Sequence, residues 1–213
     1  MSEKLTVGVL GLQGDLEEHI KAVENAHTNS AEAVLVKDTD SMKKIDALII
    51  PGGESTVMGG LSSIKGIVPA LRDRITGGLP VLGTCAGMIM LAKKAYDRVV
   101  NETNQPLIGT LDVTVERNAF GRQRESFEAR LNLTIPGGED FSGVFIRAPV
   151  IKSTGEGVTE LARFEGNIVA VQQRNAIATS FHPELSGSTL VHEYLIGLAA
   201  SYREARSHQK SVG

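Results

Sequence analysis

The sequence has one cysteine, no tryptophan and few aromatic residues, and its charges nearly balance. A single cysteine cannot form an internal disulfide, which suits a reducing compartment, so we expect a cytoplasmic protein. Aromatic residues make up only 4% of the chain, which argues against stacking platforms for bases or sugars. The formal net charge of −3 gives no electrostatic attraction to nucleic acid or to an anionic membrane surface.

Long hydrophobic runs and linkers are also lacking. No apolar stretch approaches the length of a membrane-spanning helix, and no Gly/Ser- or Pro-rich linker or internal repeat divides the sequence. The 213 residues, of which 41% are hydrophobic, provide enough apolar material for one large core. We therefore expect a single domain over residues 1–213, with a polar, frayed tail from about residue 207.

Short, uniformly apolar segments at residues 5–10, 33–36 and 47–50 alternate with helical patterns in the first half. Strands that are apolar on both faces are typical of a parallel sheet covered by helices on each side. From Leu111 onward, short alternating segments separated by Gly, Pro and Asn favour antiparallel or mixed strands. The sequence predicts an α/β fold: a flavodoxin-like three-layer sandwich with a mainly parallel central sheet and added antiparallel strands in the second half.

Other elements follow from local signals. Asp15 and Glu18 make a capping-box-like pair that starts a helix. Residues 67–75 have a helical pattern that two glycines stop. We expect the polar stretch over residues 97–106 to be a surface loop and the apolar residues 176–181 to be a strand.

A Gly-x-Cys-x-Gly motif lies between an apolar run and a helix-favouring run over residues 79–91. This order is typical of a nucleophile elbow, a sharp turn from strand to helix that exposes one side chain. Gly83 and Gly87 fit that turn because a Cβ at either position would clash with a neighbouring element. Cys85 would lie at a helix N-terminus, where N–H groups and the helix dipole favour a thiolate. The alternative for a lone cysteine is a small buried hydrophobe.

The sequence Pro-Gly-Gly-Glu-Ser at residues 51–55 follows the apolar segment 47–50. In a doubly wound sheet the ligand crevice lies beyond the carboxyl ends of the strands, so paired glycines there can turn backbone N–H groups toward a ligand. No Gly-Lys-Ser/Thr is present, which disfavours a phosphate loop. The tetrapeptide recurs at 136–139 after the alternating segment 131–135, where we expect a half-exposed strand and then a plain turn.

His182 ends an apolar strand, at the sheet edge that should also present Cys85. Pro183 fixes the following backbone, and residues i and i+2 of an extended segment point the same way, which places Glu184 beside His182. A carboxylate next to an imidazole holds its tautomer and orientation. No zinc-type ligand spacing is present, and we expect no metal. For the other four histidines a surface or packing role is the default: His19, His27, His192 and His208.

Several motifs together resemble a known family. The elbow at 83–87 with His182-Pro183-Glu184 resembles the triad class of glutamine amidotransferases. A finer signature is similar to the glutaminase subunits of pyridoxal 5′-phosphate synthases, and the similarity extends from about Val7 to the C-terminal helix. Its segments are residues 8–14, 51–56, 115–123, 145–149 and 180–184.

The resemblance implies a mechanism and a site. Cys85 would attack the side-chain amide of L-glutamine, His182 would act as acid and base, and Glu184 would orient His182. The backbone N–H groups of Gly53 and Ala86 would bind the oxyanion. The resemblance places the substrate near Gly53, Glu54, Ser55, Arg117, Ile146 and Arg147, and an arginine guanidinium suits the α-carboxylate.

The resemblance also implies a partner. A barrel-shaped synthase subunit would receive the ammonia in a large hetero-oligomer, and the glutaminase would be nearly silent until docking settles the Gly52-Gly53 peptide. The chain would carry no cofactor of its own. Three alternatives stay open: a glutaminase that serves another synthase, a related α/β cysteine hydrolase, and a non-catalytic regulatory module with this fold.

Overall fold

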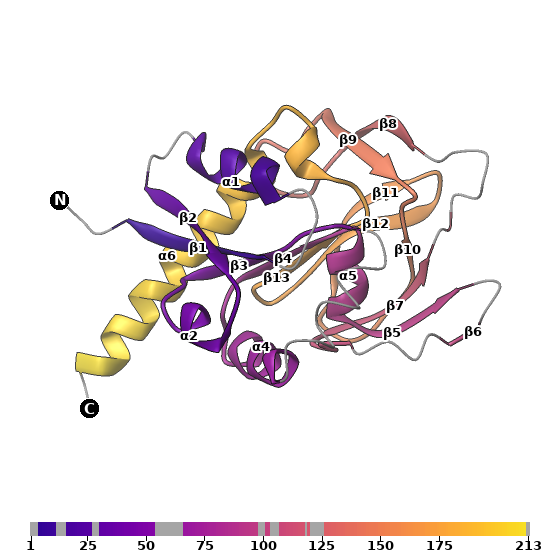
Figure 1. Ribbon diagram of the computed structural model, residues 1–213. Coiled ribbons are helices and arrows are strands. Elements are labelled where there is room, and N and C mark those ends of the chain that lie inside the picture. The colour runs from indigo at the N-terminus through magenta and orange to yellow at the C-terminus, as the bar shows by residue number, and fades with distance from the viewer. Residues whose placement is uncertain are drawn as a thin grey trace.

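The computed structural model of the protein describes residues 4–11, 16–26, 30–53, 66–97, 101–102, 107–117, 119 and 126–211. Within these residues, one sheet of eleven strands runs through the molecule and helices cover its two faces (Figure 1). A separate two-stranded sheet shares an apolar core with one face of the large sheet (Figure 1).

The parallel part of the sheet contains β1 (Leu5–Leu10), β2 (Ala31–Val36), β3 (Ala47–Ile50), β4 (Val81–Thr84) and β13 (Ala176–Thr179). These strands are parallel neighbours in the order β2-β1-β3-β4-β13. All residues of β3, β4 and β13 are buried, which explains why these strands are apolar apart from the threonine that ends β4 and the one that ends β13. This is the flavodoxin-like strand order, in which ligands bind beyond the carboxyl ends of the strands.

The other strands are mostly antiparallel. β12 (Asn167–Gln173) pairs antiparallel with β13, β11 (Thr159–Phe164) and β10 (Val150–Thr154). Beyond β10 lie β7 (Leu111–Arg117), β5 (Ala92–Asp97) and β6 (Asn101–Glu102), of which β5 and β7 are parallel. The two-stranded sheet is formed by β8 (Ser126–Leu131) and β9 (Phe141–Ile146). The predicted α/β fold, parallel first and antiparallel later, is confirmed.

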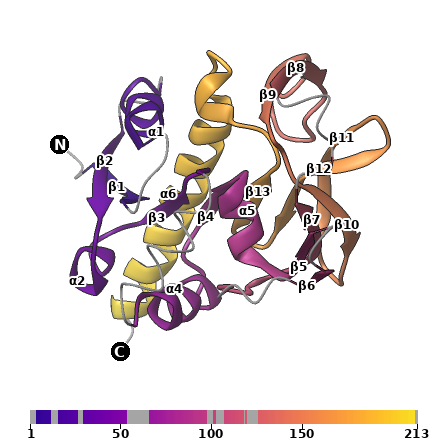
Figure 2. The same cartoon turned by 45° about the vertical axis from the view of Figure 1, so that its right-hand side comes forward.

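The helices bury one apolar core on each face of the sheet. On one face, α1 (Leu16–Glu24) and α6 (Leu190–Ser211) contribute Val23 and Leu195. On the other, α2 (Thr39–Met42), α4 (Ile67–Thr76) and α5 (Ala86–Leu91) contribute Met42, Leu71 and Met88. Figure 2 shows α4 and α5 in front of the sheet and α6 behind it. No helix in the described part of the chain is long and apolar enough to cross a membrane.

Two predictions are wrong, one for a polar segment and one for a segment of alternating apolar and polar residues. The stretch over residues 97–106 is not wholly a loop, because Asn101 and Glu102 pair back on β5 as a short edge strand. The strand expected over 131–135 stops at Leu131. After Leu131 the backbone makes hydrogen bonds outside the strand pair. The N–H of Leu133 donates to the carbonyl of Gly138, and the N–H of Thr134 donates to the carbonyl of Leu161.

Three further features differ from the sequence predictions. The strand expected over 176–181 ends at Thr179. Strand β10, over Val150–Thr154, was not expected. The tail is not frayed from residue 207, because α6 continues to Ser211 through Lys, Gln and Arg, which are good helix formers. Asp15, the expected helix cap, lies outside the described residues.

The two copies of Pro-Gly-Gly-Glu lie in different structural environments, as expected. At 136–139 the chain makes a turn, in which the N–H of Gly138 donates to the carbonyl of Ile135 and Gly137 has a φ of 75°. The copy at 51–54 follows the buried strand β3 at its carboxyl end. Burial of the preceding strand, rather than the tetrapeptide itself, places the first copy at the ligand edge.

The elbow glycines lie where the backbone of α5 crosses β3 and β4. A Cβ on Gly83 would be 2.7 Å from the carbonyl oxygen of Gly87, and a Cβ on Gly87 would overlap the carbonyl oxygen of Ile50. Backbone atoms cannot move aside as a flexible side chain can. The prediction that both positions require glycine is therefore confirmed, and the reason is the close contact between the helix and the strands.

We predict that Gly87→Ala lowers the free energy of unfolding by about 3 kcal/mol, because the added methyl group forces α5 away from β3. The control is Gly197→Ala in α6, where an added Cβ meets nothing within 4 Å. That variant should be neutral or more stable by up to about 1 kcal/mol. Urea unfolding measures both, and equal stability of the two variants would contradict the packing argument.

Candidate active site

Cys85 occupies the turn between β4 and α5 in a strained backbone conformation. Its φ is 48° and its ψ is −104°, and its backbone N–H donates to the carbonyl of Thr179 in β13. A non-glycine residue in this region costs about 1–3 kcal/mol, and such strain gathers at functional sites. The side chain is partly exposed, so the thiol is not sealed in the core as the packing alternative required.

His182 follows β13, and its backbone N–H donates to the carbonyl of Val144 in β9. Its Nδ1 lies 2.7 Å from Oε1 of Glu184. Both side chains are buried. We expected an extended segment to place Glu184 beside His182. Instead, His182 is extended and Pro183–Leu185 form a turn of 3-10 helix, which brings the two side chains together. Proline suits the first position of this turn, where no N–H is needed.

Gly52, just beyond β3, lies against both Cys85 and the ring of His182. A Cβ built on Gly52 would lie 2.6 Å from Cε1 of His182 and 3.2 Å from Cβ of Cys85. The N–H of Gly52 donates to Oγ1 of Thr84 at 3.0 Å. The carboxyl ends of β3, β4 and β13 therefore bring the glycine loop, Cys85 and His182 together at one edge of the sheet.

The charge state of His182 is set by its two neighbours. Burial lowers the pKa of His182, but hydrogen bonds and charge interactions with Cys85 and Glu184 outweigh it and raise the pKa to about 10. The ring is therefore protonated at neutral pH. An imidazolium beside Cys85 holds a proton that can be given to a leaving group.

Among the other expected site residues, Ile146 contacts this cluster. The carbonyl oxygen of Ile146 is 3.8 Å from Sγ of Cys85, and Arg147 follows with a φ of 44°. Arg117 ends β7, and its segment is joined to the Arg147 segment by the N–H of Ala119, which donates to Ala148.

The two residues expected to bind the oxyanion also flank the cluster. Gly53 follows Gly52, and Ala86 is the first residue of α5. Glu54 and Ser55 lie outside the described residues. Within the described residues, no group of three or more His, Cys, Asp or Glu side chains could hold a metal ion.

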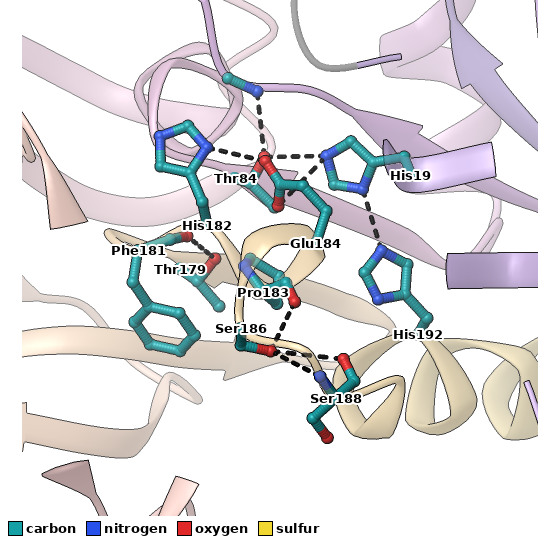
Figure 3. A network of polar contacts seen from close by, with 11 residues as sticks. His19, Thr84, Thr179, Phe181, His182, Pro183, Glu184, Ser186, Ser188 and His192 are labelled. Atoms are coloured by element: carbon teal, nitrogen blue, oxygen red, sulfur yellow. Dashed lines mark hydrogen bonds and ion pairs between the residues drawn. The ribbon is translucent and has the colours of Figure 1, made fainter. Parts of the chain in front are cut away.

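Sequence reasoning missed two histidines that reach the back of this cluster (Figure 3). Nε2 of His19 lies 3.5 Å from Oε2 of Glu184 and 3.4 Å from Oγ1 of Thr84. Nδ1 of His19 lies 2.9 Å from Nε2 of His192. Both rings are fully buried, so a surface role is excluded. The available signal was the position of His19 on the apolar stripe of α1, between Leu16 and Val23.

Burial keeps both of these histidines neutral. It lowers the pKa of His192 to about 4. The pKa of His19 is lowered well below its usual value, first by burial and then by the nearby His192 and His182. The unfolded chain binds protons at these positions below about pH 6.5, where the folded protein does not.

We predict that acid destabilises the protein partly through His192. Between pH 6.5 and 4 the unfolded His192 gains a proton and the folded one does not, so the free energy of unfolding falls by about 3 kcal/mol from this group. His192→Leu should show a smaller fall over this range in urea unfolding. His208→Leu, at an exposed position of α6, is the matched control for replacing a histidine of this helix by leucine. Identical pH dependence in wild type and His192→Leu would contradict the assignment.

Comparisons with known proteins agree with the motif resemblance. Residues 9–200 match the model of the SNO glutamine amidotransferase family. The chain is 48% identical to pyridoxal 5′-phosphate synthase subunit PdxT of Sulfolobus acidocaldarius, over 90% of this chain and 98% of that protein. It is 46% identical to the subunit PdxT of Streptomyces coelicolor, over 97% of this chain and 100% of that protein.

Solved structures show the same similarity. A crystal structure of a glutamine amidotransferase matches with a TM-score of 0.81 and 44% identity, over 91% of this chain and 98% of that chain. A chain of PurLQS from Thermotoga maritima matches with a TM-score of 0.62 and 16% identity, over 94% of this chain and 99% of that chain, and at that identity it shows the fold alone. The match to the family model and the identity to the PdxT proteins together establish that this chain belongs to the SNO glutamine amidotransferase family.

Proposed function

We propose that this chain hydrolyses L-glutamine to glutamate and ammonia as the glutaminase subunit of a pyridoxal 5′-phosphate synthase. Membership of the glutamine amidotransferase family and the identity to PdxT proteins support the activity and the pathway. The observation that carries the proposal is the meeting of Cys85, His182 and Glu184 at one sheet edge, with the imidazole protonated between the thiol and the carboxylate.

In the first half of the reaction, the Cys85 thiolate attacks the side-chain carbonyl carbon of glutamine. The carbon–sulfur bond forms as the carbonyl electrons move to oxygen, and the N–H groups of Gly53 and Ala86 bind that oxyanion, each contributing ~3 kcal/mol. The intermediate collapses as the carbon–nitrogen bond breaks. His182 gives its proton to the departing nitrogen, which leaves ammonia and a γ-glutamyl thioester.

In the second half, His182 is neutral and acts as a base. It takes a proton from a water molecule as the water oxygen attacks the thioester carbon. The carbon–sulfur bond then breaks, glutamate forms and the thiolate returns beside a protonated His182. Glu184 holds Nδ1 of the ring throughout, which directs the other ring nitrogen to the reacting atoms and stabilises the imidazolium.

The substrate contacts remain those that the family resemblance implies. The guanidinium groups of Arg117 and Arg147 suit the α-carboxylate of glutamine, because a guanidinium can form two parallel hydrogen bonds with a carboxylate. The bond from Ala119 to Ala148 joins their two segments and supports a shared role. Gly53, Glu54, Ser55 and Ile146 complete the proposed contacts with the substrate.

Ammonia released to water is protonated and loses its nucleophilicity, so the chain should deliver it to a partner. We place the barrel-fold synthase subunit in that role, in a large hetero-oligomer, and the names of the PdxT relatives support this. The chain would act in the cytoplasm as a single domain over residues 1–213.

We predict that Cys85→Ala lowers glutamine hydrolysis by the complex with the synthase subunit ~1,000-fold or more, because the nucleophile is lost. Synthesis driven by added ammonium should continue at the wild-type rate, since the partner's chemistry does not use Cys85. A glutamate-release assay and a pyridoxal 5′-phosphate assay measure the two activities. Persistent glutamine hydrolysis in the variant would rule out Cys85 as the nucleophile.

We also predict that the free chain hydrolyses glutamine slowly and that the synthase subunit raises the rate. The reason is that docking settles the Gly52-Gly53 peptide so that the N–H of Gly53 can bind the oxyanion. The measurement is the rate of glutamate release with increasing synthase subunit at fixed glutaminase concentration. Equal rates with and without the partner would show that the free chain already holds a complete oxyanion site.

A further inference from the structure

Glu184 has two carboxylate oxygens, and the proposed mechanism uses only one. Oε1 accepts the hydrogen bond from His182, whereas Oε2 faces Nε2 of His19 in α1 (Figure 3). Both side chains of the Glu184–His19 pair are fully buried, and Nε2 of His19 is 3.5 Å from Oε2. Within the described residues Oε2 has no hydrogen bond, so His19 is the polar group that faces it. A buried carboxylate oxygen without a donor is costly, which gives this contact a function.

The proton positions along this chain of contacts can be assigned from the carboxylate. Ionised Glu184 can only accept, so a neutral His19 that satisfies it must carry its proton on Nε2. Nδ1 of His19 is then an acceptor, and Nε2 of His192 must be the donor across the 2.9 Å contact. This leaves Nδ1 of His192 as a bare acceptor, and the structure gives it no hydrogen-bond partner among the described residues. An unpaired ring acceptor is a smaller defect than an unpaired buried N–H.

The neutrality of His19 matters for the triad. A protonated His19 would share the negative charge of Glu184 and weaken its attraction for the His182 ring. Burial disfavours that charge, and His192 stands behind His19 as a second neutral ring. A neutral His19 therefore faces Oε2 and leaves the charge of the carboxylate available to His182.

We propose that His19, held by His192, is a positioning residue that fixes Glu184 through Oε2 and so aims Oε1 at His182. The distance of 3.5 Å is longer than a normal hydrogen bond, and we expect it to shorten when substrate fills the site. The proposal rests on the proposed function, since it assigns His19 to the same triad. His19 lies in α1, and this helix packs against the 3-10 turn that carries Glu184.

The same nitrogen of His19 also faces the glycine loop. Thr84 accepts the N–H of Gly52 on Oγ1, and Nε2 of His19 lies 3.4 Å from that oxygen. His19 thus stands between the carboxylate of the triad and the side chain that anchors the loop. A substitution here should change the rate of the chemical step more than the affinity for glutamine.

Three substitutions separate positioning from packing. In His19→Gln the side-chain NH₂ can replace Nε2 and still donate to Glu184. In His19→Asn the shorter amide replaces Nδ1, so it can bond to His192 and cannot reach Glu184. His19→Leu removes both groups. Each variant is assayed as the full chain in complex with the synthase subunit, and thermal unfolding confirms that it is folded.

We expect kcat for glutamine hydrolysis to fall ~10-fold or more in His19→Asn and His19→Leu, with KM unchanged within about twofold. His19→Gln should stay within about threefold of wild type. Equal losses in His19→Gln and His19→Asn, or no loss in His19→Leu, would overturn the proposal. Failure of all three variants to fold would also overturn it, because the role of His19 would then be structural.

A second readout does not depend on activity. NMR titration of the histidine rings in the free chain measures the pKa of His182, which should fall in His19→Asn and His19→Leu and stay at the wild-type value in His19→Gln. An unchanged pKa of His182 in all three variants would count against positioning. Should the wild-type complex fail to hydrolyse glutamine, the proposed function would fail, and this titration would still decide whether His19 fixes Glu184.

Discussion

The close approach of three chain segments at one edge of the sheet is the constraint on which the site depends. Gly52, Cys85 and His182 follow β3, β4 and β13, which are adjacent parallel strands. Only a residue without a side chain fits beside Cys85 and His182, since a Cβ on Gly52 would meet the His182 ring at 2.6 Å. The strained backbone of Cys85 is held by its bond to Thr179, so the geometry is built into the sheet rather than into a mobile loop.

Electrostatics then decides what this geometry can do. Cys85 and Glu184 hold His182 in its protonated form, whereas burial holds His19 and His192 neutral. One buried cluster thus contains imidazoles in two different charge states, set by whether a charged partner or an apolar surrounding dominates. A charged ring next to the thiol and neutral rings behind the carboxylate together direct the negative charge of Glu184 toward the reacting side.

The sequence predicted the parallel strands, the elbow and the meeting of Cys85 with His182, because buried strands and tight glycine turns leave strong local patterns. The family resemblance is confirmed by the match over residues 9–200. The contact between His19 and His192 was not predictable, since 173 positions separate two residues that each look like an ordinary helical histidine. Strand β10 was missed because only two of its five residues are buried and no apolar alternation marks it.

The most direct test of the account is to treat the complex of this chain and the synthase subunit with a diazoketone analogue of glutamine and to locate the adduct by mass spectrometry. The account predicts one covalent adduct on Cys85, loss of glutamine hydrolysis in step with labelling, and protection by excess glutamine. Glutamine hydrolysis that continues after complete labelling of Cys85, or inactivation that leaves Cys85 unmodified, would contradict it.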